Sequence, residues 1–149
     1  MALRFLAPRP RTEYELRQRL RRAGFEVAAI DQVVAQLEQH HLLDDAAFAQ
    51  RWVEQRRAMR PSGARLVRAE LRRHGVDAAT AEAAAAGVEG MAEADAYRAA
   101  ARRAAQLAGL TDERAFRTRL GQFLARRGFD WETIASVVER VSAEYLSRS

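Results

Sequence analysis

The sequence predicts an all-α protein made of three tandem three-helix repeats that form an elongated, curved body. One frame recurs three times: an apolar residue, a leucine four positions on, a glycine four after that, and then Phe or Val. Its glycines, Gly24, Gly75 and Gly128, are 51 and 53 residues apart. No segment alternates apolar and polar residues as a half-buried strand does. The three copies of the frame are Leu16, Leu20, Gly24, Phe25; Val67, Leu71, Gly75, Val76; and Leu120, Leu124, Gly128, Phe129.

The first repeat is expected over residues 1–43. Residues 1–7 predict a shortened first helix, because the prolines that follow at positions 8 and 10 lack a backbone donor. Thr12 with Glu15 three positions later is a capping box that opens the second helix, and Gly24 supplies the left-handed residue that ends it. The third helix carries apolar residues at helical spacing, namely Ile30, Val33, Val34 and Leu37.

The second repeat is expected over residues 44–90. Asp44 and Asp45 are acidic caps for a helix that runs to about Arg60. The side chains expected to be buried on this helix are Phe48, Trp52, Val53 and Met59. A short basic helix then ends at Gly75, and residues 78–88 are mostly alanine. Alanine favours helix but buries little area, so this last helix either packs closely or is held loosely.

The third repeat is expected over residues 91–149. Its first helix begins near Met91, and Thr111 is the expected cap of its second. Asp130 caps the last helix. The second helix is lined by Phe116, Leu120, Phe123 and Leu124. The apolar residues of the last helix repeat the spacing of the first unit: Ile134, Val137, Val138, Val141.

Composition limits the function classes. The chain of 149 residues has no cysteine and no apolar run approaching the roughly 20 residues of a spanning helix, so we expect a cytoplasmic protein without disulfides. A net charge of +5 favours an anionic partner. All 25 basic residues are arginine, however, which is also what a GC-rich coding sequence produces. The positions of the arginines therefore carry more information than their identity.

The sharpest surface feature is an arginine stripe on the central helix. At 100° per residue, Arg65, Arg68 and Arg72 lie opposite the apolar face. The stripe is either the solvated face of an amphipathic helix or a surface that contacts phosphates or carboxylates of a partner. The other candidate partner-binding residues are Arg51, Arg56 and Arg57 on the preceding helix, and Arg17, Arg21, Arg126 and Arg127 in the flanking repeats.

No catalytic residues, cofactor or metal are expected, so the chain is not predicted to be an enzyme. The histidines at positions 40, 41 and 74 fall at helix C-termini, where they cap, and none has a second histidine four residues on. Asp44 and Asp45 are better explained as caps than as an acid and base pair. Trp52 is expected in the core, whereas Trp131 begins a helix and could stack on a base.

Four motifs in a fixed order resemble the RecX family, the regulators of the bacterial RecA recombinase. They are Thr12, Glu15, Leu16, Leu20, Gly24, Phe25; then Leu43, Asp44, Asp45, Phe48, Ala49; then Gly63, Glu70, Leu71, Gly75, Val76; and finally Arg127, Gly128, Phe129. The resemblance covers nearly the whole chain. The family usually has a longer helix before the first glycine-ended unit than residues 1–7 provide.

The resemblance implies a non-enzymatic protein that binds the RecA filament along its groove. It implies inhibition of filament growth, ATP hydrolysis, strand exchange and coprotease activity, and so a role in DNA repair, recombination and the SOS response. The alternatives are a helix-turn-helix type module that binds single- or double-stranded DNA directly, and an adaptor for another protein. A monomer is expected, with a dimer left open.

Overall fold

The structure is a computed structural model that describes residues 11–147, and within these residues it contains eight α-helices and no strand. The helices are α2 (Glu13–Arg22), α3 (Val27–Gln39), α4 (Asp45–Met59), α5 (Ala64–Arg73), α6 (Ala78–Glu89), α7 (Ala92–Gln106), α8 (Glu113–Arg126) and α9 (Trp131–Leu146). The helix expected over residues 1–7 lies outside the described residues. The all-α prediction is confirmed, while the repeat boundaries expected at residues 43 and 90 stay predictions.

The predicted helix ends are largely confirmed. Thr12 and Glu15 form the complete capping box at the start of α2. Gly24, Gly75 and Gly128 each have a positive φ, between 85° and 93°, as left-handed residues at helix ends do. One cap was wrong: the side chain that accepts a hydrogen bond at the start of α8 belongs to Asp112 and not to Thr111.

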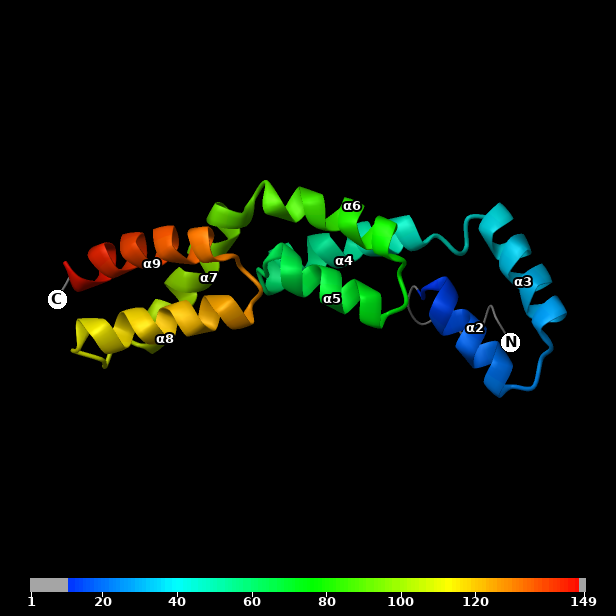
Figure 1. The fold of residues 1–149 in the computed structure, drawn as a ribbon, viewed down its shortest axis with the longest axis horizontal. Helices are drawn as coiled ribbons and strands as arrows, with labels where there is room; N and C mark the ends of the chain where they lie inside the picture. The colour runs from blue at the N-terminus through cyan, green and yellow to red at the C-terminus, as the bar shows by residue number, and fades with distance from the viewer. Residues whose placement is uncertain (1–10, 148–149) are drawn as a thin grey trace.

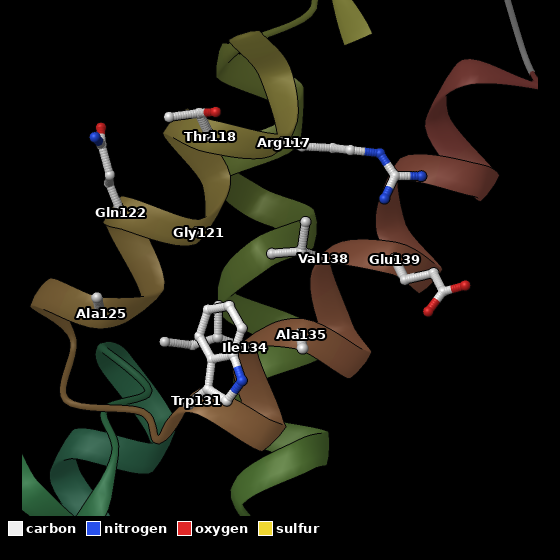
Figure 2. Close-up of a pocket in the computed structure, with 10 residues that line it drawn as sticks. All are labelled: Arg117, Thr118, Gly121, Gln122, Ala125, Trp131, Ile134, Ala135, Val138 and Glu139. Carbon is white, nitrogen blue, oxygen red and sulfur yellow. The ribbon is translucent and has the colours of Figure 1, made fainter. Parts of the chain in front are cut away.

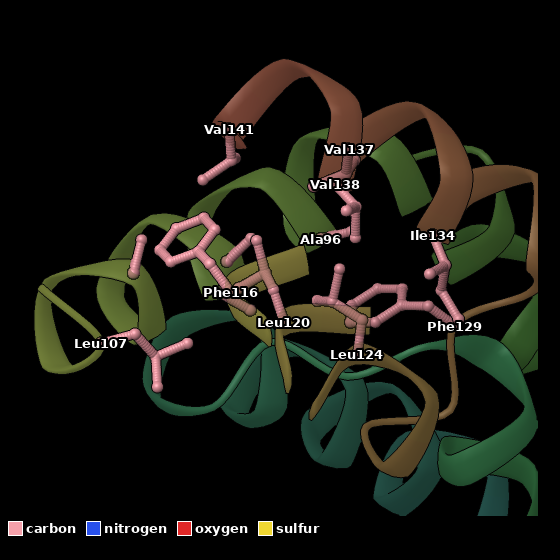
Figure 3. Packing of buried hydrophobic residues seen from close by; sticks show 13 residues of the cluster. Ala96, Leu107, Phe116, Leu120, Leu124, Phe129, Ile134, Val137, Val138 and Val141 are labelled. Atoms are coloured by element: carbon pink, nitrogen blue, oxygen red, sulfur yellow. The ribbon is translucent and has the colours of Figure 1, made fainter. Parts of the chain in front are cut away.

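Each repeat has its own apolar core. The cluster between α7, α8 and α9 includes Leu120 and Leu124, both fully buried (Figure 3). The second cluster, between α4, α5 and α6, contains Val67 and Leu71, and the first joins α2 to α3. The alanine-rich helix α6 packs closely, because its inward side chains are all at most 2% exposed: Ala81, Ala84, Ala85 and Val88. Met59 was wrongly expected in the core; it is 72% exposed on the last residue of α4.

The repeats follow one another along an elongated body (Figure 1). Helices α8, α5 and α2 succeed each other along one side, and α9, α6 and α3 along the other. Helices α4 and α7 pack behind them, α4 against α5 and α6, and α7 against α8 and α9. No helix in residues 11–147 has the length and apolar character needed to cross a membrane.

Short polar contacts join the first repeat to the second. The hydroxyl of Thr12 donates to the carbonyl of His74, whose ring lies 3.4 Å from the Glu15 carboxylate. The backbone N–H of Glu13 donates to Asp45 at 3.0 Å. Asp45 therefore holds the neighbouring repeat, and the helix cap of α4 is formed by Asp44 alone.

A second junction joins the second repeat to the third. The N–H of Gly63 donates to the carbonyl of Arg127 at 2.7 Å. The carboxylate of Asp95, which is 0% exposed, accepts hydrogen bonds from Arg57 at 3.1 Å and from Arg98 at 2.8 Å. Charge-assisted bonds to a buried carboxylate are strong, so this ion pair fixes α4 against α7.

Candidate functional site

The arginines of the central stripe are all engaged within the protein. Arg65 on α5 donates to the carbonyl of Ala125 on α8 at 2.8 Å. Arg68 donates to Glu82 and to Glu89 on α6, each at 3.2 Å. The third, Arg72, donates to the carbonyl of Val76 at 3.1 Å. The stripe thus helps to hold α5 against its neighbours, and none of its three guanidinium groups is without an internal partner.

Two candidates on α4 are also held by carboxylates. Arg56 forms a two-point ion pair with Glu70 and lies 5.0 Å from the centre of the Trp52 ring. Arg57 belongs to the Asp95 pair that joins the second and third repeats. Trp52, which was expected in the core, is only partly buried; it packs against the second cluster and donates to Glu70.

The remaining candidates differ in their surroundings. Arg17 donates to Asp31 at 2.7 Å and to Glu13 at 3.4 Å, and the bond to Asp31 raises the pKa of Arg17 above its usual value. Arg51, Arg21 and Arg126 are exposed, and no carboxylate among the described residues pairs with them. These three are free to meet a partner, but they belong to different helices.

Arg127 stands at the centre of a cluster that the sequence did not indicate in full. Its guanidinium donates to the carbonyl of Pro61 at 3.1 Å and covers the ring of Phe123 at 4.7 Å. Burial lowers the pKa of Arg127, and repulsion from Arg60, Arg56 and Arg102 lowers it further. We call these four arginines, at positions 56, 60, 102 and 127, the junction cluster.

The junction cluster draws on both repeats that meet there. Arg56 and Arg60 come from the end of α4, Arg102 from α7 and Arg127 from the end of α8. Within the described chain only Arg56 pairs with a carboxylate. Like charges held together without counter-charges bind an anion favourably, so the cluster is suited to phosphate or carboxylate groups.

Arg60 and Arg102 were missed because helical periodicity assigns residues to a face of one helix only. The two residues are separated by 42 positions. Arg60 approaches Arg127 only when the third repeat packs on the second, whereas Arg102 approaches it through the packing of α7 on α8. No repeat motif includes them. A sequence signal for such a cluster would require the inter-repeat contacts to be known beforehand.

A groove lies between α8 and α9 in the third repeat (Figure 2). Its volume is about 600 Å³, and its floor is apolar, with Ile134 and Val138 on α9 and Gly121 on α8. Trp131 stands at one end of the groove and is 77% exposed. Ala125, whose carbonyl binds Arg65, also lines it. An exposed tryptophan beside arginines can stack on an aromatic or planar group of a partner.

The junction between the first and second repeats has the opposite charge. A hollow of about 360 Å³ is lined by acidic side chains, namely Glu13, Glu38, Asp44, Asp45 and Asp77, with His41 and Leu43. Burial raises the pKa of Asp45, and the nearby carboxylates of Glu13, Asp77 and Asp44 raise it further. No group of residues with the makeup of a metal site occurs within residues 11–147.

Comparison with known proteins agrees with this architecture. Models of the first, second and third three-helix domains of RecX match residues 1–37, 44–84 and 92–138 in order. Two similar relatives are each called "Regulatory protein RecX". That of Amycolatopsis mediterranei is 36% identical over 97% of this chain and 82% of its own length. The protein of Chlorobium limicola is 36% identical over 94% of this chain and 86% of its own length.

The fold matches that of a solved structure. The crystal structure of RecX from Lactobacillus salivarius superposes with a TM-score of 0.81, covering 95% of this chain and 92% of the other at 20% identity. Three repeat models in order, two relatives of similar length and a shared architecture agree with one another. The chain belongs to the RecX family of regulatory proteins.

Proposed function

We propose that this protein binds the RecA filament and restrains its growth, ATP hydrolysis, strand exchange and coprotease activity. The observation that carries the proposal is the match of all three RecX repeat models in order along one chain. Such a regulator would act in the bacterial cytoplasm, in DNA repair, recombination and the SOS response. The elongated body supports this role, because a row of repeats presents a long surface to a helical groove.

We further propose that the junction cluster makes the charged contact with the filament. Like Arg127, Arg60 and Arg102 have no carboxylate partner among the described residues, and both repel the partly buried Arg127. An acidic surface or a phosphate would relieve the repulsion within the cluster. The arginines of the central stripe are already bound internally, so they contribute less to this contact.

The test is the double substitution Arg60→Gln with Arg102→Gln. Neither side chain has an internal ion pair to lose, so the melting temperature should stay within a few degrees of wild type. Inhibition of RecA ATP hydrolysis on single-stranded DNA should need several times more protein, because two charges that meet the partner are gone. The matched control is Arg114→Gln with Arg119→Gln, which removes the same charge from exposed positions on α8.

The two variants give opposite outcomes if the proposal holds. If the double variant and its control both inhibit as well as wild type, the junction cluster does not contact the filament. A loss of inhibition in both would show that net charge alone is responsible. Loss only in the first supports a local contact.

A second candidate function is direct DNA binding. It is favoured by the exposed Trp131 at one end of a groove that Arg117 also lines, since an arginine and a free indole together bind phosphates and bases. This function predicts tight binding to bare DNA, with an affinity that falls steeply as salt increases. A filament regulator instead acts at concentrations too low to coat the DNA. Fluorescence anisotropy with a labelled oligonucleotide over a range of salt concentrations distinguishes the two.

A further inference from the structure

The two repeat junctions share one arrangement. At the first, the carbonyl of His74, the C-cap residue of α5, accepts a hydrogen bond from Thr12, the N-cap residue of α2. At the second, the carbonyl of Arg127, the C-cap residue of α8, accepts from the N–H of Gly63, the N-cap residue of α5. The end of one helix thus meets the start of the equivalent helix in the preceding repeat (Figure 1).

The glycine after each C-cap makes this close approach possible. A Cβ on Gly75 would lie 2.1 Å from the Cβ of Tyr14 near the start of α2. A Cβ on Gly128 would lie 2.5 Å from the Cβ of Leu66 near the start of α5. Real Cβ atoms do not approach so closely, so both joints depend on glycine. The joint is therefore a repeated unit of this fold with its own packing requirement.

Within residues 11–147, one copy of the same helix end has no partner. Gly24 follows α2 with the same left-handed backbone, φ +93°, but nothing lies within 4 Å of the place its Cβ would take. Ala23, the C-cap residue, is exposed, and within residues 11–147 its carbonyl accepts no hydrogen bond. Phe25 and Val27 beside the turn are 47% and 65% exposed, which leaves apolar surface at this end.

The matching helix start, at the other end of the molecule, also has no partner among the described residues. Helix α8 begins with the exposed Asp112 and Glu113, and no later glycine turn in the described chain meets it. In Figure 1 this end of α8 and the C-terminal end of α2 face in opposite directions along the body. Each molecule therefore offers both halves of the joint, one at each end.

The two free halves have complementary charges. Helix α2 ends in Arg21 and Arg22, and α8 begins with Asp112 and Glu113. The internal joint between α5 and α2 has the same arrangement, with a basic last turn facing an acidic first turn. Helix dipoles add to the attraction, because the negative C-terminus of one helix meets the positive N-terminus of the next.

We propose that copies of this protein associate head to tail, with the end of α2 in one copy docked on the start of α8 in another. The contact repeats the internal joint between molecules. Because its two sides differ, it generates an open chain and not a closed dimer. One joint without the Asp95 ion pair is a small interface, so the association is weak and reversible. The inference rests on the repeat geometry and does not depend on the proposed action on RecA.

Charge reversal tests the proposal. In sedimentation velocity, the wild-type sedimentation coefficient and frictional ratio should both rise with protein concentration. Arg21→Glu with Arg22→Glu should abolish the rise, and so should Asp112→Arg with Glu113→Arg. An equimolar mixture of the two variants should associate again, because each reversed end finds its complement in the other variant. Arg119→Glu and Glu54→Arg, at exposed positions away from both ends, are the matched controls and should leave the rise unchanged.

Disulfide trapping gives an independent readout, because the natural chain has no cysteine. An Ala23→Cys copy mixed with a Thr111→Cys copy should yield a covalent dimer under mild oxidation. Ala23→Cys mixed with Thr118→Cys, in the middle of α8, should yield several times less. A wild-type protein that sediments as a monomer up to millimolar concentration, or equal trapping in both mixtures, would overturn the proposal. Failure of the charge-reversed mixture to associate would also do so.

Discussion

Three glycine-to-alanine substitutions separate backbone strain from inter-repeat packing. Gly24 has a left-handed backbone with open space around it. Gly63 has an ordinary backbone, φ −78°, but an added Cβ would lie 2.2 Å from the carbonyl oxygen of Gly128. Gly128 combines both conditions, because its φ is +87° and its Cβ would meet the backbone of Leu66 at 2.6 Å. The set therefore isolates each cost and then combines them.

The expected losses of stability follow from these geometries. A left-handed alanine costs about 1–2 kcal/mol. The alanine side chain also restricts the unfolded chain, which stabilises the folded protein by about 0.4–1 kcal/mol. The net loss of stability for Gly24→Ala should therefore be roughly 1 kcal/mol. Overpacking against backbone costs about 1–3 kcal/mol, and Gly63→Ala should lie near the upper end because a backbone carbonyl moves little. Gly128→Ala should lose the sum, about 3–4 kcal/mol.

Urea unfolding followed by circular dichroism measures all three free energies on the same scale. The ranking Gly24→Ala, then Gly63→Ala, then Gly128→Ala, from the smallest loss to the largest, is the expected result. Because Gly63 and Gly128 touch, the double variant should lose less than the two single losses combined. If Gly63→Ala were as stable as wild type, the close contact between the second and third repeats would be refuted.

Three further predictions concern the junctions and the central stripe. Asp95→Asn leaves Arg57 and Arg98 without a charged partner and should lower the free energy of unfolding by about 2–4 kcal/mol. Asp31→Asn removes an exposed ion pair and should lower it by less than about 1 kcal/mol in the same unfolding experiment. Asp45→Asn should raise the melting temperature at pH 7. The raised pKa of Asp45 means that folding favours its protonated form. The ionised carboxylate therefore lowers the free energy of unfolding at pH 7, and this loss disappears as the pH falls through that pKa. The gain should therefore shrink in acid, and a gain constant from pH 7 to pH 4 would contradict this. Asp77, whose pKa is lowered by hydrogen bonds from Thr80, has the opposite sign and loses its contribution as the pH falls. Replacing Arg65, Arg68 and Arg72 together by Gln should lower the free energy of unfolding by roughly 1 kcal/mol, because each side chain has an internal partner. An unchanged urea midpoint would show that these internal contacts do not stabilise the protein.

Local sequence signals predicted the helices because their causes are local. The Thr12 and Glu15 box, the Asp44 and Asp130 caps and the three glycine ends all act within one turn of helix. Each was readable from residue type and spacing. The choice between Thr111 and Asp112 failed because adjacent residues are both good caps, so residue type alone does not tell at which of them the helix begins.

Contacts between repeats were not predictable in the same way. The central arginines were placed correctly on the polar face of α5, but that face meets α6 and α8 and not only solvent. Arg60 approaches Arg127 because Gly63 packs on Gly128 and Arg57 reaches Asp95. Arg102 approaches Arg127 within the third repeat, where α7 packs on α8. Helical periodicity describes one helix at a time, so it contains no information about which repeat surfaces meet.

RecA ATP hydrolysis on single-stranded DNA, with this protein added well below the RecA concentration, tests whether the protein acts on the filament. A parallel anisotropy titration measures its binding to the same DNA without RecA. We expect strong suppression of hydrolysis at concentrations where little bare DNA is bound, with suppression weakened by the Arg60→Gln and Arg102→Gln substitutions. Hydrolysis that falls only as the DNA becomes coated, or that does not change, would contradict this expectation.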